Sequence, residues 1–132
     1  MAGPVPRRRV LVIEDEDSIA TALHHLLTRE GYDHDRLASG AGAVARIRTS
    51  RPDLVLLDVM LPGASGYEIC QHVRRDPALA GVKILMMTAG GAAAERGGGL
   101  AHGADGFILK PFALQDLRAE VRRLLTPAPP PG

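Results

Sequence analysis

Five side chains with acidic, hydroxyl or ammonium groups stand at the ends of short apolar runs, where this chain could do chemistry. They are Glu14, Asp15, Asp58, Thr88 and Lys110. Phosphoryl transfer requires an oxygen nucleophile, neutralisation of charge and positioned donors. Asp58 is the best candidate nucleophile, because it ends the predicted central strand and has a candidate partner on each side.

The charges of these groups predict a metal ion. Three carboxylates and one ammonium leave an excess of two negative charges if all are ionised, which is unfavourable in a crevice. Either one carboxyl group is protonated or a divalent cation binds. Ligands that are all oxygen favour a hard ion, and an incomplete protein shell completed by water suits Mg²⁺ or Mn²⁺.

Simpler interpretations of the same acids stay open. Asp58 could cap the turn that Pro62 and Gly63 form. The acids Glu14–Asp17 could favour a helix N-terminus through its dipole. Four acids in a row are nevertheless more than a cap needs, and their mutual repulsion requires a positive group nearby.

The apolar runs that precede these groups are predicted strands. The run Leu54–Leu57 has no polar alternation, which is typical of a strand buried on both faces of a parallel sheet. Tyr32–Ala38 is charged and suits a sheet edge. The remaining predicted strands are Arg9–Ile13, Val82–Met87 and Asp105–Leu109.

Helical patterns follow the predicted strands. Apolar residues from Ile19 to Leu27 recur at helical spacing, and Gly31 ends that helix. A second helix is expected to start at Ser39, and Ser65–Glu68 resembles a capping box that opens a third, ending near Asp76. The last helix is predicted near Ala113–Leu125. The segment Gly90–Gly103 is rich in glycine and alanine, so we expect a short, frayed or mobile element there.

Alternation of strand and helix predicts an α/β fold with a parallel sheet and helices on both faces. A polar second strand at one edge suits the doubly wound strand order 2-1-3-4-5. All five strands then end at the same rim, where open α/β sheets bind ligands. The five polar groups are therefore expected to converge.

Length and composition limit the other function classes. The chain has 132 residues, enough for one domain, and a net charge of +1 that gives no support to nucleic-acid binding. The single cysteine, Cys70, excludes a disulfide within the chain, and no apolar run is long enough for a membrane span.

We expect a domain at residues 9–125, an N-terminal tail at 1–8 and a proline-rich tail or linker at 126–132. The five histidines show no ligand spacing and are expected on the surface; they are His24, His25, His34, His72 and His102.

Four motifs, in this order and at these separations, resemble the receiver domain of two-component response regulators. They are Val-Leu-Val-Ile-Glu-Asp-Glu at 10–16, Leu-Val-Leu-Leu-Asp-Val-Met-Leu-Pro-Gly at 54–63, Met-Thr-Ala at 87–89 and Gly-Ala-Asp-Gly-Phe-Ile-Leu-Lys-Pro-Phe at 103–112. The resemblance implies a flavodoxin-like (βα)5 fold and a phosphorylatable signalling switch in the cytoplasm. The resemblance also implies that the domain is not a metabolic enzyme and that it catalyses only its own phosphorylation and dephosphorylation.

The resemblance also implies a role for each residue. Asp58 would be the phosphoacceptor, and Glu14, Asp15, Asp58 and the backbone oxygen of Met60 would hold Mg²⁺. Thr88 and Lys110 would bind the phosphoryl oxygens, and the Lys110–Pro111 peptide bond would be cis. Thr88 and Phe107 would form the conformational switch, although Phe107 has no hydroxyl group and could instead be an ordinary core residue.

A histidine kinase or a phosphotransfer protein would be the partner, and an effector domain could follow residue 132. The resemblance implies no direct contact of this domain with nucleic acid or a membrane.

Two alternative functions stay open. A phosphatase with an aspartyl nucleophile would normally need a second Asp where Met60 stands. A docking module would keep the fold without phosphorylation.

Overall fold

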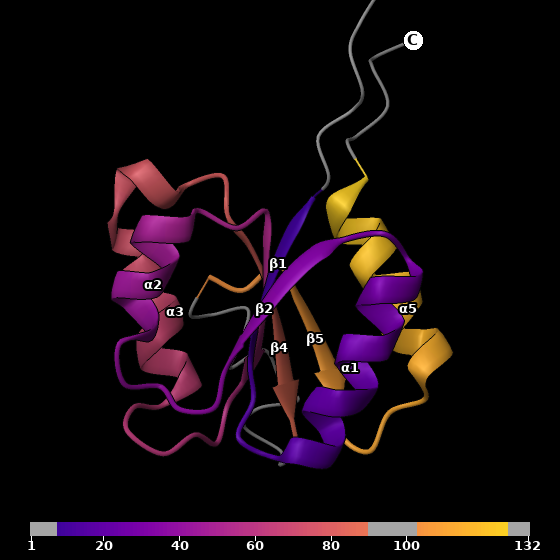
Figure 1. The fold of residues 1–132 in the computed structure, drawn as a ribbon. Helices are drawn as coiled ribbons and strands as arrows, with labels where there is room; N and C mark the ends of the chain where they lie inside the picture. Colours follow the sequence, from indigo (N-terminus) through magenta and orange to yellow (C-terminus); the bar gives the residue numbers. More distant parts are fainter. Residues whose placement is uncertain (1–7, 90–102, 127–132) are drawn as a thin grey trace, which may run out of the picture.

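The computed structural model describes residues 8–89 and 103–126, which form a parallel sheet covered by helices on both faces (Figure 1). The five strands lie in the order β2-β1-β3-β4-β5, which confirms the predicted doubly wound fold. The strands are β1 (Arg9–Ile13), β2 (Asp33–Leu37), β3 (Leu54–Asp58), β4 (Lys83–Thr88) and β5 (Gly106–Leu109). The helices are α1 (Asp17–Arg29), α2 (Ala43–Ser50), α3 (Gly66–Arg75), the 3₁₀ helix η1 (Pro77–Leu79) and α5 (Leu114–Leu125).

Strand β3 is the centre of the sheet. All five of its residues are buried, including Asp58, because β1 and β4 flank it and helices cover both faces. The register pairs Leu57 with Ile13 of β1 and Asp58 with Met87 of β4. The unbroken apolar run of the sequence is therefore explained by burial on both sides.

Two apolar layers hold the helices to the sheet. Helices α1 and α5 lie on one face, and α2 and α3 lie on the other (Figure 1). Val10 and Val12 of β1 pack in the layer that contains residues of α1 and α5, whereas Leu11 and Ile13 pack in the layer that contains residues of α2 and α3. Period-two alternation within each strand divides its side chains between the two layers. The result is a central sheet that is packed on both faces and whose strand ends are held in register.

The second helix begins later than the sequence predicted. Helix α2 starts at Ala43, not at Ser39, because the intervening residues bind another loop. Ser39 Oγ donates to the Pro62 carbonyl at 3.0 Å, and the Gly40 amide donates to the same oxygen at 2.8 Å. Gly42 then has a positive φ of 74°, which ends the loop before the helix.

The other element ends lie close to their predicted positions. Ser65 caps α3 by accepting from the Tyr67 amide at 3.1 Å, and Ala113 precedes α5 without a side-chain cap. The expectation for the glycine-rich segment falls on residues 90–102, which lie outside the described residues. No helix within the described ranges is both long enough and apolar enough to cross a membrane.

Candidate functional site

The carboxyl ends of four neighbouring strands bring the predicted groups to one rim of the sheet. Asp58 and Thr88 are the last residues of β3 and β4. Glu14 directly follows β1, and Lys110 directly follows β5. Parallel pairing through β1, β3, β4 and β5 places these four ends side by side.

Three carboxylates form a compact acidic cluster. One side-chain oxygen from each of Glu14, Asp15 and Asp58 lies within 4.8 Å of the others. Glu14 is fully buried and Asp58 is 4% exposed, whereas Asp15 is exposed. The cluster is therefore anchored in the protein on one side and reaches solvent on the other.

Lys110 bridges two members of the acidic cluster. Its Nζ lies 2.6 Å from Glu14 Oε1 and 3.2 Å from Asp58 Oδ2. The Lys110 amide donates to the Thr88 carbonyl at 2.6 Å, which ties the start of the following loop to β4. The Lys110–Pro111 peptide bond is cis. The ammonium is mostly buried, with 13% of the side chain exposed.

The burial and charge of the site shift two pKa values. Burial raises the pKa of Glu14 above its ordinary value of 4.5, and this outweighs the hydrogen bond from Lys110, which acts in the opposite direction. Burial alone would lower the pKa of Lys110, but its hydrogen bond to Glu14 and the charges of Asp58 and Glu14 raise it. Lys110 therefore stays protonated, while ionisation of Glu14 has a free-energy cost in the metal-free protein.

Backbone amides fix the two buried carboxylates. The Met60 amide donates to Asp58 Oδ1 at 3.1 Å, and the Glu16 amide donates to Glu14 Oε2 at 3.1 Å. Behind Asp58, the first residue of α3 is Gly66, and its backbone lies so close that an added Cβ would overlap the Asp58 carbonyl oxygen. The carboxylates are thus oriented before any ligand binds.

The donor set fits a hard divalent cation. Three carboxylates supply oxygen ligands, and exposed Asp15 leaves space for the water that Mg²⁺ normally retains. The proposed fourth protein ligand is the backbone oxygen of Met60. Met60 lies in the loop after β3 and lines the same surface hollow as Asp15, and 74% of the residue's surface is exposed.

The two predicted switch residues occupy different environments. Thr88 is buried, with 3% of its surface exposed, at the end of β4 beside the acidic cluster. Phe107 of β5 is half-buried and packs against the apolar layer that α2 and α3 cover. Among the predicted surface histidines, His24, His25 and His72 are exposed and His34 is half-buried. His102 lies outside the described residues.

Sequence reasoning missed one residue that contacts the site. Arg36 of β2 donates from Nη2 and Nε to the Glu14 backbone oxygen, at 2.8 and 3.0 Å. From the sequence alone, the charged residues of this strand predict only protection of a sheet edge. The signal that could have found Arg36 is the need for a positive group near four consecutive acids, at the matching end of the neighbouring strand.

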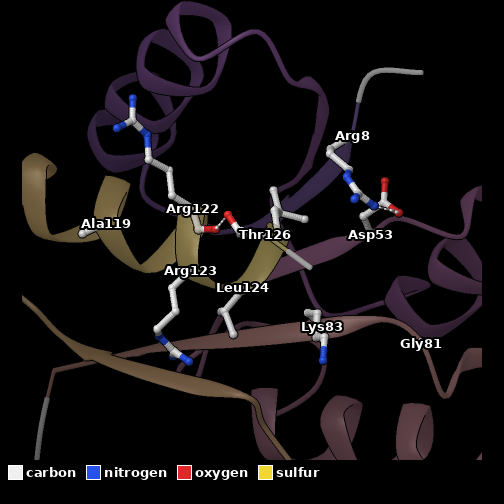
Figure 2. A pocket seen from close by; sticks show the side chains of 10 residues that line it. Arg8, Asp53, Gly81, Lys83, Ala119, Arg122, Arg123, Leu124 and Thr126 are labelled. Atoms are coloured by element: carbon white, nitrogen blue, oxygen red, sulfur yellow. Dashed lines mark hydrogen bonds and ion pairs between the residues drawn. The ribbon is translucent and has the colours of Figure 1, made fainter. Parts of the chain in front are cut away.

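A larger hollow of about 780 Å³ lies at the opposite rim of the sheet, near the C-terminal end of α5 (Figure 2). Several cationic side chains line it, but they do not converge on a common point. Arg122 and Arg123 leave α5 in different directions (Figure 2). Arg122 pairs with Glu30, and Arg8 lies 3.7 Å from Asp53. The rim with the acidic cluster therefore remains the candidate site.

Comparisons with known proteins agree with this geometry. The family model described as "Response regulator receiver domain" matches residues 10–122. The phosphate regulon transcriptional regulatory protein PhoB of Rhizobium meliloti is 40% identical over 122 residues, which are 92% of this chain and 54% of that protein. The chain thus spans about half the length of the curated relatives it matches.

Solved structures share the fold. A crystal structure of a putative response regulator from Chloroflexus aurantiacus has a TM-score of 0.84 and 36% identity, covering 91% of this chain and 98% of that one. The receiver domain of a sensor histidine kinase from Pseudomonas aeruginosa has a TM-score of 0.81 and 27% identity, covering 90% and 98%. That crystal structure holds a magnesium ion coordinated in the active-site cleft.

Proposed function

The chain belongs to the family of response regulator receiver domains of two-component systems, and on that premise we propose that Asp58 accepts a phosphoryl group from a phosphohistidine. The observation that supports this most strongly is the contact of Lys110 with both Asp58 and Glu14 at the rim of the sheet. It gives an oxygen nucleophile that is fixed in orientation, next to a cation that can bind the transferred group.

The proposed transfer has a simple balance of bonds. One Asp58 carboxylate oxygen attacks phosphorus, the bond from phosphorus to the histidine nitrogen breaks, and an acyl phosphate forms. The electron pair of the broken bond stays on the imidazole ring. The Lys110 ammonium and the Thr88 hydroxyl would bind the phosphoryl oxygens and balance their charge. Water would later attack the phosphorus, so that inorganic phosphate leaves and the Asp58 carboxylate is regenerated.

Glu14, Asp15, Asp58 and the Met60 backbone oxygen would hold Mg²⁺ in this proposal. The ion would neutralise charge on the acids and on the phosphoryl oxygens. The compact acidic cluster supports this ligand set, as does the magnesium ion coordinated in the Pseudomonas aeruginosa receiver domain. Mn²⁺, which takes similar oxygen ligands, would serve the same role.

Phosphorylation would be read out through Thr88 and Phe107. Thr88 would move toward the phosphoryl group, and the half-buried ring of Phe107 would rotate inward behind it. We propose residues 9–125 as a cytoplasmic switch domain, a histidine kinase or phosphotransfer protein as the phosphoryl donor, and an effector domain as the element that the switch controls. The relatives' length and the name "transcriptional regulatory protein" support an effector that controls transcription.

Intact-mass spectrometry after incubation with acetyl phosphate tests this function. With Mg²⁺, the protein should gain the mass of one phosphoryl group, and with EDTA it should not. The Asp58→Asn variant should gain none under either condition. Failure of the native chain to gain mass with Mg²⁺ would favour a docking module without phosphorylation. Repeated turnover of a generic phosphate ester would favour a phosphatase instead.

A further inference from the structure

Arg36 binds the loop that carries two of the proposed metal ligands. We call Glu14–Glu16, between β1 and α1, the acid loop. Arg36 Nη2 and Nε both donate to the Glu14 backbone oxygen, at 2.8 and 3.0 Å. Its remaining nitrogen, Nη1, donates to Asp17 Oδ1 at 2.9 Å, in the first turn of α1. One side chain thus spans the acid loop from its first residue to the helix behind it.

The neighbouring strand holds both main-chain polar groups of Glu14. Its amide donates to the Leu37 carbonyl at 3.0 Å, and its carbonyl accepts from Arg36. Arg36 lies on the side of β2 that faces α1, as its bond to Asp17 shows. Asp35, the preceding residue, instead pairs with Arg46 of α2 on the other side of the strand. Alternation along an edge strand therefore aims one guanidinium at the acid loop.

The acid loop needs such a constraint. Glu14, Asp15 and Asp58 repel one another when ionised, and Asp15 is exposed, so few packing contacts hold it. A guanidinium presents its donors in a rigid planar fork, which fixes the direction of the carbonyl that accepts from it. Fixing that carbonyl fixes the peptide that joins Glu14 to Asp15.

We propose that Arg36 is a positioning residue that holds the acid loop in the conformation that binds Mg²⁺. The proposal deepens the proposed function, since it rests on the same metal site. Arg36 itself touches neither the metal nor the phosphoryl group. It acts through the Glu14 carbonyl, and the edge strand thereby sets the metal affinity of the site.

If Arg36 had a purely electrostatic role, its removal would change the Mg²⁺ affinity in the opposite direction. If Arg36 acted only through its positive charge, it would repel a divalent cation, and removing it would tighten Mg²⁺ binding. Positioning predicts weaker binding when the fork is removed. Arg36→Lys keeps the charge and removes the fork, so it separates the two effects.

Isothermal titration of the full chain with MgCl₂ tests the proposal. Arg36→Met should bind Mg²⁺ about tenfold more weakly, at the low end of what loss of an outer-shell partner costs. Arg36→Lys should show most of the same loss. Arg46→Met is the matched control, because it breaks an arginine–aspartate pair to the same strand without touching the acid loop. It should bind Mg²⁺ as the native chain does.

A second readout separates positioning from a general loss of fold. At saturating Mg²⁺, Arg36→Met should be phosphorylated by acetyl phosphate at the native rate, with only the required Mg²⁺ concentration raised. Native or tighter Mg²⁺ binding by Arg36→Met would overturn the proposal, as would an equal loss in Arg46→Met. If the native chain binds Mg²⁺ but is never phosphorylated, the proposed function fails. The ratio of the Mg²⁺ affinities of Arg36→Met and the native chain still decides the role of Arg36.

Discussion

Lys110 Nζ lies 2.6 Å from Glu14 Oε1, although 96 residues separate the two in the chain. The contact joins the end of β5 to the end of β1 across the two strands between them, and it also draws in Asp58. In the metal-free protein the ammonium is the positive group that the acidic cluster requires. A divalent cation would therefore compete with Lys110 for the same carboxylate oxygens.

Replacing Lys110 by methionine should separate metal binding from phosphoryl transfer. Without the ammonium, Mg²⁺ should bind more tightly, because its competitor is gone, while phosphorylation by acetyl phosphate should slow. The free energy of unfolding in EDTA should fall by about 3 kcal/mol, the low end for truncating one member of a buried pair, since Glu14 can take up a proton instead. Urea unfolding and Mg²⁺ titration measure these effects.

Lys83→Met is the control for that experiment. Lys83 is the other lysine of the chain and is exposed at the start of β4, at the opposite rim. Its substitution should change none of the three quantities. Weaker Mg²⁺ binding in Lys110→Met than in Lys83→Met would contradict competition between the ammonium and the metal.

The raised pKa of Glu14 predicts a pH-dependent gain from Glu14→Gln. A carboxyl group whose pKa is raised on folding contributes stability that is complete below its ordinary pKa of 4.5 and is lost as pH rises through the folded value. Glutamine cannot ionise and escapes that loss. In EDTA, the free energy of unfolding of Glu14→Gln relative to the native chain should therefore increase from pH 4.5 upward and then level off.

Urea unfolding at several pH values measures this gain. Saturating Mg²⁺ should reduce or reverse it, because the ion binds the ionised carboxylate and stabilises the native chain more than the variant. A stability difference that stays constant with pH in EDTA would show that ionisation of Glu14 has no cost in the folded protein.

The close approach of α3 to β3 makes Gly66 sensitive to substitution. A Cβ at this position would overlap the Asp58 carbonyl oxygen and lie 2.8 Å from Val59 Cα. Both neighbours are backbone atoms and cannot rotate away. Gly66→Ala should lower the free energy of unfolding by about 2–3 kcal/mol, as overpacking of a buried site does. It should also slow phosphorylation, because Asp58 would shift.

Gly81→Ala is the matched control, since a Cβ there would have no atom within 4 Å apart from those of Gly81 and its two chain neighbours, and Gly81 has no positive φ. Its free energy of unfolding should stay within about 0.5 kcal/mol of the native value, or rise slightly. Equal stability of the Gly66→Ala and Gly81→Ala variants in urea would contradict the close approach.

Much of this fold follows from local sequence pattern. The run Leu54–Leu57 predicted a central strand because burial on both faces requires apolar residues at every position. Polar residues at the strand ends predicted the convergence of Asp58 and Lys110, since parallel strands share one rim. These inferences need only the strand period and the topology.

The misplaced start of α2 and the role of Arg36 required three-dimensional contacts. Ser39 has a residue type that commonly begins a helix, but here its hydroxyl binds the Pro62 carbonyl of another loop. The sequence indicates for Arg36 only a charge that protects the edge of the sheet. Its contact with the site could not be predicted, because its acceptor, the Glu14 carbonyl, is a main-chain group. The identity of a side chain does not reveal where a distant backbone oxygen points.

The most direct test of the central claim is the position of the phosphoryl group. Tandem mass spectrometry of peptides from the native chain, after acetyl phosphate and Mg²⁺, should find the group on Asp58 alone. Asp53→Asn, at the opposite end of the same strand, should be labelled as the native chain is. A phosphoryl group on any other residue, or labelling that persists in Asp58→Asn, would contradict the account.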